Sequence, residues 1–396
     1  MEIGSSNKRR RSASTIFCTY VVRNTEFALA RVQQAAHSLS VEDQKLVFKT
    51  LNYALKYDET WPVTRNLLMS VAQKMEQAGY RGEWMAYLEI ALQHCQKQKD
   101  LFAEANFHFY MGIIYQHQSK FEFARRQLQC SALQFKQIGD ELYEARALNR
   151  LAYVARLQRR LEEAKRTVER AQLLAKDDPA ELAYSYLVRG SIALDQKDWQ
   201  NAENFFDHSL TLWKKTEDKR GVAWGWTNLG TAFRVLKKHN DAISCYLEAI
   251  ALFEEVSDPV HQAVARMNLG NAYLDLDQPK KALKFYNLSE PIFYDAQEWL
   301  RLAKVNLNKA IAYQYLKNWP QAECACLSSI EQWRQIGSIS SMVKASISLA
   351  EIYIDQGLHK KASEVLHDAD NELQQIEDEI GYDELSNIIT KMLNTL

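Results

Sequence analysis

The stretch NLGNAYLDL, residues 268–276, places a glycine inside a segment whose apolar residues follow a helical spacing. A glycine in the interior of a helix costs about 1 kcal/mol relative to alanine, so something other than helix propensity must select Gly270. The same register recurs along the chain at spacings of 38 or 40 residues, and each copy is glycine or alanine. The copies are Ala72, Gly112, Ala152, Gly190, Gly230, Gly270, Ala310 and Ala350. Such a repeat predicts a series of similar structural units.

Two more registers of small residues accompany the first. Bulky residues follow three positions after the first register, as at Tyr273, and four positions after the second, as at Tyr286. Two helices approach closely only where both present small side chains, and a bulky side chain fills the space beside the contact. Each repeat is therefore predicted to be an antiparallel helix pair in which Gly270 makes room for the neighbouring helix. The second register holds Trp84, Ala124, Ala164, Ala202, Ala242, Ala282, Ala322 and Ala362, and the third, seven residues later, holds only alanine and serine.

The segments between these registers carry turn and capping signals. Asp277-Gln278-Pro279 and Gln356-Gly357-Leu358 lie at equivalent places inside two repeats. Between repeats, Asp178-Pro179-Ala180-Glu181 has the form of an N-cap, a proline at the first helical position and a glutamate at the third. Asp258-Pro259 repeats the start of that pattern and predicts another helix start.

The three small registers, with aromatic or apolar residues between them, resemble the tetratricopeptide repeat. The commonest form of that repeat has a period of about 34 residues, and HEAT and armadillo arrays, which share the longer period, lack the triplet of small residues. The chain is similar to the long-helix tetratricopeptide arrays of spindle-orientation adaptors, kinesin light chains and bacterial regulators. The resemblance implies an all-α, right-handed superhelical solenoid of antiparallel helix pairs, with eight repeats over residues 65–382.

Three residues depart from this pattern. Trp84 occupies a normally small position in the first repeat, Cys326 occupies an aromatic position in the seventh, and Pro291 lies inside a second helix. Because proline lacks a backbone donor, we expect Pro291 to end or kink the second helix of the sixth repeat.

Outside the repeats the sequence predicts three further segments. These are a disordered basic tail over residues 1–14, an N-terminal helical cap over residues 15–64 and a C-terminal capping helix over residues 383–396. A second helix of the N-terminal cap is expected to start at Ser40-Val41-Glu42-Asp43. The stretch 75–100, MEQAGYRGEWMAYLEIALQHCQKQKD, resembles the start of tetratricopeptide arrays in multidomain signalling ATPases, but the phosphate-binding pattern G-x-x-x-x-G-K-[ST] is absent from the sequence.

Composition and charge argue against several classes of protein. Lys and Arg number 49 against 50 Asp and Glu, so no strongly basic surface for nucleic acid is indicated. No apolar run is long enough to span a membrane, and the N-terminus lacks the apolar core of a secretion signal. The six cysteines are too scattered for a disulfide framework. We therefore expect a cytoplasmic protein that does not bind a membrane.

The usual catalytic and metal-binding motifs are absent. The sequence contains no H-E-x-x-H, no paired C-x-x-C and no G-x-S-x-G. Cys324 and Cys326 lie two residues apart on an expected helix, so they point about 200° apart and cannot hold one metal ion. His94 and Cys95 are adjacent on an expected helix and do not face each other. The run Lys8–Arg11 either binds an anionic surface or is simply solvated. We expect no enzymatic activity, no cofactor and no metal.

Asn268 has equivalents in the adjoining repeats. Its register lies about 200° around the helix from the small residue two positions later, so these amides should point away from the partner helix. In the tetratricopeptide family this face lines a concave groove that holds extended peptides. The alternative is that the polar residues on this face are only solvated. The resemblance implies a peptide-binding site formed by Asn228, Asn268, Asn308, Asn271, Arg150, Trp224, Arg234, Lys304, Gln314 and Lys344.

The sequence therefore favours a non-enzymatic adaptor or regulator that captures an extended segment of a partner protein in its groove. The alternative is a sensor of a short signalling peptide, similar to the bacterial Rap-type regulators, which join an N-terminal helical module to tetratricopeptide repeats. Recovery of one large protein from a native lysate would favour the adaptor, whereas tight binding of a free short peptide would favour the sensor.

Overall fold

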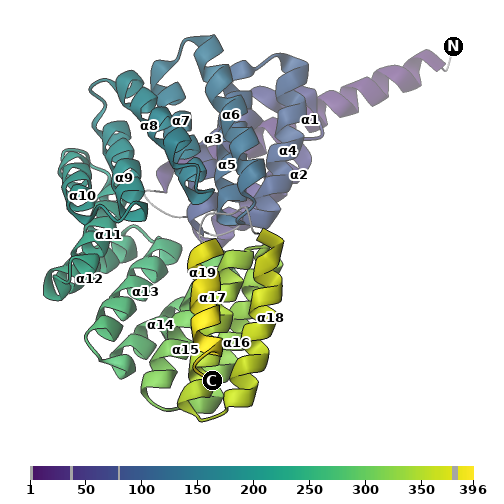
Figure 1. Ribbon diagram of the computed structural model, residues 1–396. Coiled ribbons are helices and arrows are strands. Elements are labelled where there is room, and N and C mark those ends of the chain that lie inside the picture. The colour runs from purple at the N-terminus through teal and green to yellow at the C-terminus, as the bar shows by residue number, and fades with distance from the viewer. Residues whose placement is uncertain (1–2, 36–38, 79–80, 377–381) are drawn as a thin grey trace. The chain divides into compact units, whose positions relative to one another are not determined.

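The computed structural model describes residues 3–35, 39–78, 81–376 and 382–396. In these ranges every regular element is a helix and no strand is present. Successive helices form the antiparallel pairs that the small-residue registers predict, which confirms the all-α solenoid class (Figure 1).

The described helices fall into three groups. The N-terminal group is α1 (Ile3–Gln34), α2 (Val41–Ala54) and the 3-10 helix η1 (Asp58–Thr60). The pairs are α3 (Trp61–Ala78) with α4 (Arg81–Gln98), α5 (Leu101–His117) with α6 (Phe121–Ile138), α7 (Glu141–Leu157) with α8 (Leu161–Ala175), α9 (Pro179–Asp195) with α10 (Trp199–Trp213), α11 (Lys219–Val235) with α12 (His239–Glu255), α13 (Pro259–Asp275) with α14 (Pro279–Asp295), α15 (Trp299–Tyr315) with α16 (Trp319–Ile336) and α17 (Ile339–Asp355) with α18 (His359–Leu373). The 3-10 helix η2 (Gln374–Ile376) and α19 (Tyr382–Leu393) follow.

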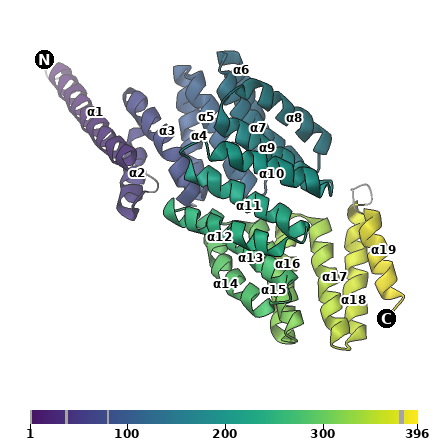
Figure 2. The same ribbon diagram turned by 90° about the vertical axis from the view of Figure 1, so that its left-hand side faces the viewer.

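Two compact units divide the chain. Unit 1 comprises residues 1–225 and 253–259, and unit 2 comprises residues 226–252 and 260–396. The first turns of α11 belong to unit 1 and the rest of that helix to unit 2. Within each unit, consecutive helices lie side by side, as α5 to α8 do in unit 1 and α15 to α18 do in unit 2 (Figures 1 and 2).

The glycines of the first register lie where the two helices of a pair come closest. A Cβ atom built on Gly270 would lie 2.5 Å from Cε1 of Tyr286, and one built on Gly190 would lie 2.5 Å from Cε1 of Phe206. These distances are too short for any side chain, so the ring from the partner helix occupies the space that a methyl group would need. The close approach predicted for Gly270 is confirmed.

Three of the four glycines in this register are opposed by an aromatic ring and the fourth, Gly112, by Leu128, whereas no alanine of the register is opposed by a ring. The residue sixteen positions after such an alanine is aliphatic or cysteine, as in Ala152 with Val168 and Ala310 with Cys326. All four of these side chains are buried. Cys326 departs from the aromatic pattern because a ring and the Cβ atom of Ala310 would compete for one space.

Three of the four serines in the third register form buried hydrogen bonds between the helices of a pair, whereas the buried hydroxyl of Ser131 has no hydrogen-bond partner within the described residues. The hydroxyl of Ser209 on α10 donates to the carbonyl of Ala183 on α9 at 2.7 Å, and Ser289 on α14 donates to Ala263 on α13 at 2.9 Å. A third such bond joins α16 to α15. The choice of serine at these positions therefore reflects hydrogen bonding as well as small size.

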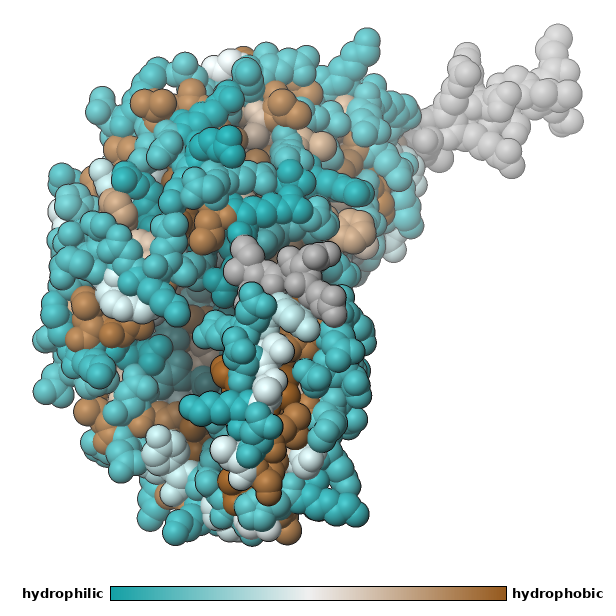
Figure 3. Space-filling model, in the orientation of Figure 1, coloured by the Kyte–Doolittle hydropathy of each residue, from teal (hydrophilic) through white to brown (hydrophobic). Residues whose placement is uncertain are grey.

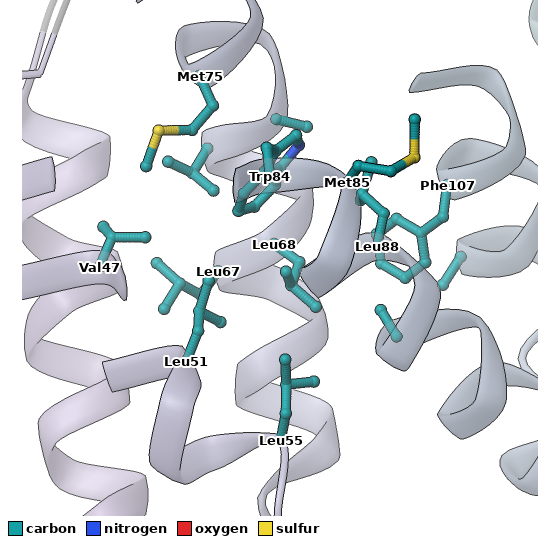
Figure 4. Close-up of a cluster of buried hydrophobic side chains, with 14 of the residues drawn as sticks. Val47, Leu51, Leu55, Leu67, Leu68, Met75, Trp84, Met85, Leu88 and Phe107 are labelled. Atoms are coloured by element: carbon teal, nitrogen blue, oxygen red, sulfur yellow. The ribbon is translucent and has the colours of Figure 1, made fainter. Parts of the chain in front are cut away.

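The N-terminal helices share one apolar core with the first helix pair. Val47 and Leu51 of α2, Leu67 and Leu68 of α3 and Trp84 of α4 lie in it (Figure 4). Trp84, which departs from the small register, is only 1% exposed. Its bulk is accommodated inside this shared core.

Ser40 caps α2 where the sequence predicts a helix start, and its hydroxyl accepts a hydrogen bond from the backbone N–H of Asp43 at 3.1 Å. The segment before it differs from expectation. α1 begins at Ile3, so residues 3–14 have a helical backbone instead of forming a disordered tail, and residues 1–2 lie outside the described part of the chain. Once a helix is nucleated, each further residue gains a hydrogen bond, so the helix extends through a polar stretch that contains no proline.

Pro291 does not end the helix that contains it. α14 continues through Pro291 to Asp295, contrary to one of the two outcomes expected from the sequence. The proline lies in the last turns of α14, so the helix loses a single internal hydrogen bond and only four residues follow.

α19 lies beside α17 and α18 (Figure 2). Its side chains Leu385 and Ile389 are buried in the same apolar cluster as Leu366 and Leu373 of α18. α19 therefore covers apolar surface of the last helix pair. No helix in the described ranges has both the length and the apolar character needed to cross a membrane.

Candidate functional site

Unit 1 contains a cavity of about 310 Å³ between its helices. Two of the site residues predicted from the sequence, Arg150 and Trp224, line the cavity. The complete lining is Gln73, Phe109, Tyr110, Ile113, Leu142, Tyr143, Arg146, Arg150, Asp178, Ala180, Glu181, Tyr184, Trp213, Asp218, Arg220 and Trp224.

Arg150 is held by aromatic side chains from the next two repeats. Its Nη1 donates a hydrogen bond to the hydroxyl of Tyr184 on α9 at 2.7 Å. Its guanidinium carbon lies 4.2 Å from the centroid of the Tyr184 ring and 5.6 Å from that of Trp224 on α11. Arg220 contacts the same indole, with its guanidinium carbon 4.6 Å from the ring centroid. Cation–π contacts of this kind fix a guanidinium without neutralising its charge.

Glu181 is an acidic residue of the same cavity. Burial raises the pKa of its carboxyl group, although the neighbouring charge of Arg146 and a hydrogen bond from Asn149 lower it. The Arg146 Nε atom lies 3.8 Å from Glu181, and the amide of Asn149 donates to Glu181 at 3.1 Å. Burial also raises the pKa of Tyr184 to about 12, so its phenol is neutral at physiological pH.

The other charged groups of the cavity have structural partners. Asp178 and Asp218 accept hydrogen bonds from the backbone N–H groups of Glu181 and Gly221 at the starts of α9 and α11. The Asp178 bond, at 2.8 Å, is the N-cap that the sequence predicts. Arg220 forms an ion pair with Asp258, in which Nε and Oδ2 are 2.6 Å apart and both side chains are buried.

In unit 2, two of the predicted amides lie against each other. The Nδ2 group of Asn308 on α15 donates to Oδ1 of Asn271 on α13 at 2.8 Å. The same oxygen accepts a hydrogen bond from the hydroxyl of Tyr286, also at 2.8 Å. The pair links the first helices of two consecutive repeats and leaves the Nδ2 group of Asn271 for another acceptor.

The remaining predicted residues are distributed over the first helices of unit 2. Arg234 pairs with Asp275 at 2.8 Å, and the Gln314 amide donates to Asp355 at 2.7 Å, so each joins its helix to the next first helix. Asn228 and Asn268 are partly buried on α11 and α13, whereas Lys304 and Lys344 are exposed on α15 and α17. The predicted residues therefore lie in two groups, one in each unit.

Three side chains considered in the sequence analysis, His94, Cys95 and Cys326, are either hydrogen-bonded or buried, and none is set up for catalysis. The Nε2 group of His94 donates a hydrogen bond to the Leu55 carbonyl at 2.8 Å, and the imidazole ring stacks on Trp61. Burial raises the pKa of the Cys326 thiol to about 12 and raises that of Cys95 as well, so neither is an activated nucleophile. Among the described residues, no group of His, Cys, Asp and Glu side chains is arranged to hold a metal ion.

Arg146, Tyr184 and Arg220 belong to the cavity but were missed in the sequence. Arg146 precedes Arg150 by four residues, which places both on one helix face, and this spacing could have identified it. Tyr184 is one of 19 tyrosines, and nothing in its sequence context shows that it faces Arg150.

Figure 3 shows hydrophilic residues over most of the visible surface, with apolar residues in separate groups, so no single large apolar patch dominates this face.

Residues 181–250 and 221–295 match the family model of the tetratricopeptide repeat. These segments are tetratricopeptide repeats. The helix pairs before and after them continue the same registers of small residues.

Curated relatives of this tetratricopeptide array include a protein of fission yeast and one of a bacterium. A segment of 81 residues is 36% identical to the anaphase-promoting complex subunit cut9 of Schizosaccharomyces pombe, and it covers 20% of this chain but only 12% of cut9. Regulatory protein RapK of Bacillus subtilis is 20% identical over 280 residues, which are 69% of this chain and 74% of RapK.

Solved structures show the same fold at low sequence identity. The Rap protein complexed with competence and sporulation factor has a TM-score of 0.55 at 15% identity, with 96% of this chain and 97% of that chain covered. Aspartyl phosphate phosphatase F from Bacillus subtilis has a TM-score of 0.53 at 15% identity, with 87% and 98% covered. The signal transduction ATPase with a tetratricopeptide repeat sensor from Pyrococcus horikoshii also has a TM-score of 0.53, at 16% identity, and this chain covers 55% of its length.

Proposed function

We propose that this chain is a regulator that binds an extended peptide along the first helices of its repeats and has no catalytic activity of its own. The observation that carries this proposal is the cavity of unit 1, because it combines aromatic walls with a few hydrogen-bonding groups from α7, α9 and α11. In unit 2, amides on α13 and α15 add donors and acceptors of the kind that match a peptide backbone.

Two ligands fit this proposal, an extended segment of a partner protein or a free short signalling peptide. The second is favoured by the extent of the likeness to Rap proteins, since the fold of the Rap protein complexed with competence and sporulation factor covers nearly the whole of this chain. The similarity to RapK, which is named a regulatory protein, also favours the short signalling peptide.

Native capture separates these two ligands. The immobilised full chain is incubated with a lysate of its own source that has been divided into a protein fraction and a short-peptide fraction. Specific retention of one protein supports capture of a partner segment, and specific retention of a short peptide supports the sensor. Retention of neither contradicts the proposal.

Asn268 provides a test of the surface in unit 2. Because an amide hydrogen bond is worth about 0.5–1.5 kcal/mol, Asn268→Ala should weaken binding of the captured ligand about 2- to 10-fold. Asn287→Ala is the matched control, since this asparagine is exposed on α14, the second helix of the same pair. Calorimetry with the captured ligand measures both variants. Equal affinity of the wild type and Asn268→Ala would show that the amide is only solvated.

A further inference from the structure

One arginine of the unit 1 cavity, Arg150, has no direct ion pair in the described part of the chain, although its charge reaches the carboxyl group of Glu181. Of the three arginines of the cavity, Arg220 is neutralised by Asp258 and Arg146 lies near Glu181. Arg150 contacts the hydroxyl and ring of Tyr184 and the ring of Trp224, and it forms no ion pair with any residue of the described ranges. A guanidinium in this position retains donors for a planar anion.

The hydroxyl of Tyr184 is a further donor in the same cavity. The Tyr184 oxygen accepts the hydrogen bond from Arg150, so the phenol's own hydrogen is left for another acceptor. Arg150 and Tyr184 together provide donors for both oxygens of a carboxylate.

We propose that this cavity binds a carboxylate of a peptide ligand, with an apolar side chain of the same ligand against its walls. This inference rests on the proposed function, because it assigns the chemistry of one part of the peptide site. Phe109, Ile113 and Leu142 supply the apolar part of the lining.

The charge around Arg150 favours a carboxylate over a phosphate. Asp178, Glu181 and Asp218 line the same cavity, so a dianion would meet three acidic side chains and only one arginine that has no direct ion pair. A singly charged carboxylate balances Arg150 alone. The carboxylate can come from the C-terminus of the peptide or from an Asp or Glu side chain, and both sources offer the same two oxygens.

Four pools of short random peptides test the proposal with the full wild-type chain. The first pool has free C-termini and all residue types, the second has amidated C-termini, the third lacks Asp and Glu, and the fourth is amidated and lacks Asp and Glu. Because hydrogen bonds to charged groups are worth more than neutral ones, we expect the fourth pool to be retained about 10- to 100-fold less than the first. Loss of retention in the second pool identifies the peptide's C-terminus as the source of the carboxylate, and loss of retention in the third pool identifies an acidic side chain.

Variants of Arg150 locate the effect. Arg150→Gln should abolish the preference for the first pool over the fourth, and Arg150→Lys should retain part of it because the charge remains. Arg166→Gln makes the same change of charge at an exposed site on α8 and should keep the full preference. Circular dichroism and melting temperature identify any variant that fails to fold. The comparison of the four pools uses the wild-type chain, so it stays valid even if a variant does not fold.

Equal retention of the first and fourth pools by the wild type would overturn the carboxylate site and leave the proposed peptide-binding function intact. A preserved preference in a folded Arg150→Gln variant would also overturn it. If the wild type retained no peptide from any pool, both the carboxylate site and the proposed binding of short peptides would be overturned.

Discussion

At the scale of single residues, the size of one side chain determines the size of another across a helix pair. Gly270 is opposed by the ring of Tyr286, and Ala310, in the next repeat, is followed in the same register by Cys326. The backbone of Gly270 is ordinary helix, not left-handed, so its conformation does not require glycine. The ring requires it, because no room remains for a Cβ atom.

A double-mutant cycle tests this dependence. Gly270→Ala should lower the free energy of unfolding by about 1–3 kcal/mol through overpacking against Tyr286. The same substitution should cost less in a Tyr286→Cys background, since the chain itself pairs Ala310 with Cys326. Urea unfolding of the wild type, the two single variants and the double variant measures the coupling. A coupling energy of zero would contradict the proposed dependence.

The sequence revealed Gly270 because size complementarity repeats at a fixed spacing, and each copy supports the others. It did not reveal that Asn308 donates to Asn271 or that Arg150 donates to Tyr184. Those bonds depend on side-chain rotamers and on how far one repeat is rotated relative to the next. Both quantities come from packing over the whole pair and leave no periodic pattern in the sequence.

At the scale of elements, the helices end at regularly spaced left-handed residues. From residue 237 to residue 357 a residue with positive φ occurs every 20 positions, at Lys237, Ser257, Asp277, Gln297, Lys317, Gly337 and Gly357. Only two of these seven are glycine, although a left-handed conformation costs a residue with a side chain about 1–2 kcal/mol. Packing between the helices therefore fixes the helix length even where the turn residue is unfavourable.

Lys317→Gly should stabilise the chain, by up to about 1 kcal/mol, because glycine adopts the left-handed conformation without steric cost. Lys284→Gly is the matched control, since Lys284 is exposed in the interior of α14, where glycine should cost about 1 kcal/mol. Thermal unfolding of both variants against the wild type gives the two signs. A loss of stability in Lys317→Gly equal to that in Lys284→Gly would show that the turn conformation carries no strain.

Helix starts were easier to predict than helix ends. Ser40 and Asp178 cap their helices as their sequence patterns indicate, because an N-cap uses a side chain that is visible in the sequence. A left-handed end at a lysine or serine has no such signal. Pro291 shows the same limit, since a proline near the end of a helix removes too little hydrogen bonding to terminate it.

At the scale of the whole molecule, α19 covers apolar surface of the helix pair that precedes it. In a solenoid each repeat packs only on its neighbours, so an end pair would expose one apolar face. Leu385 and Ile389 of α19 are 3% and 0% exposed and cover that face on α17 and α18. The sequence predicted a capping helix over residues 383–396, because the ends of a solenoid need a cover.

Removing residues 382–396 should therefore destabilise unit 2. Loss of burial for two large aliphatic side chains corresponds to about 3–6 kcal/mol. Deletion of residues 394–396, which follow the helix, is the control and should have little effect. Differential scanning calorimetry of the two truncated proteins and the full chain measures the change. Equal melting temperatures for all three would mean that α19 adds no stability to the last pair.

The even spacing of the left-handed turns also bears on how the gene can change in length. An inserted residue inside a helix rotates all later residues of that helix by about 100° and moves the small side chains away from the partner helix. A duplicated segment that runs between equivalent turns, such as Asp277 and Lys317, adds 40 residues and a complete set of contacts, and every later residue keeps its helical phase. Tandem duplication or loss of whole segments is thus the change in length that this architecture tolerates, and it gives related genes a direct route to arrays of different extent.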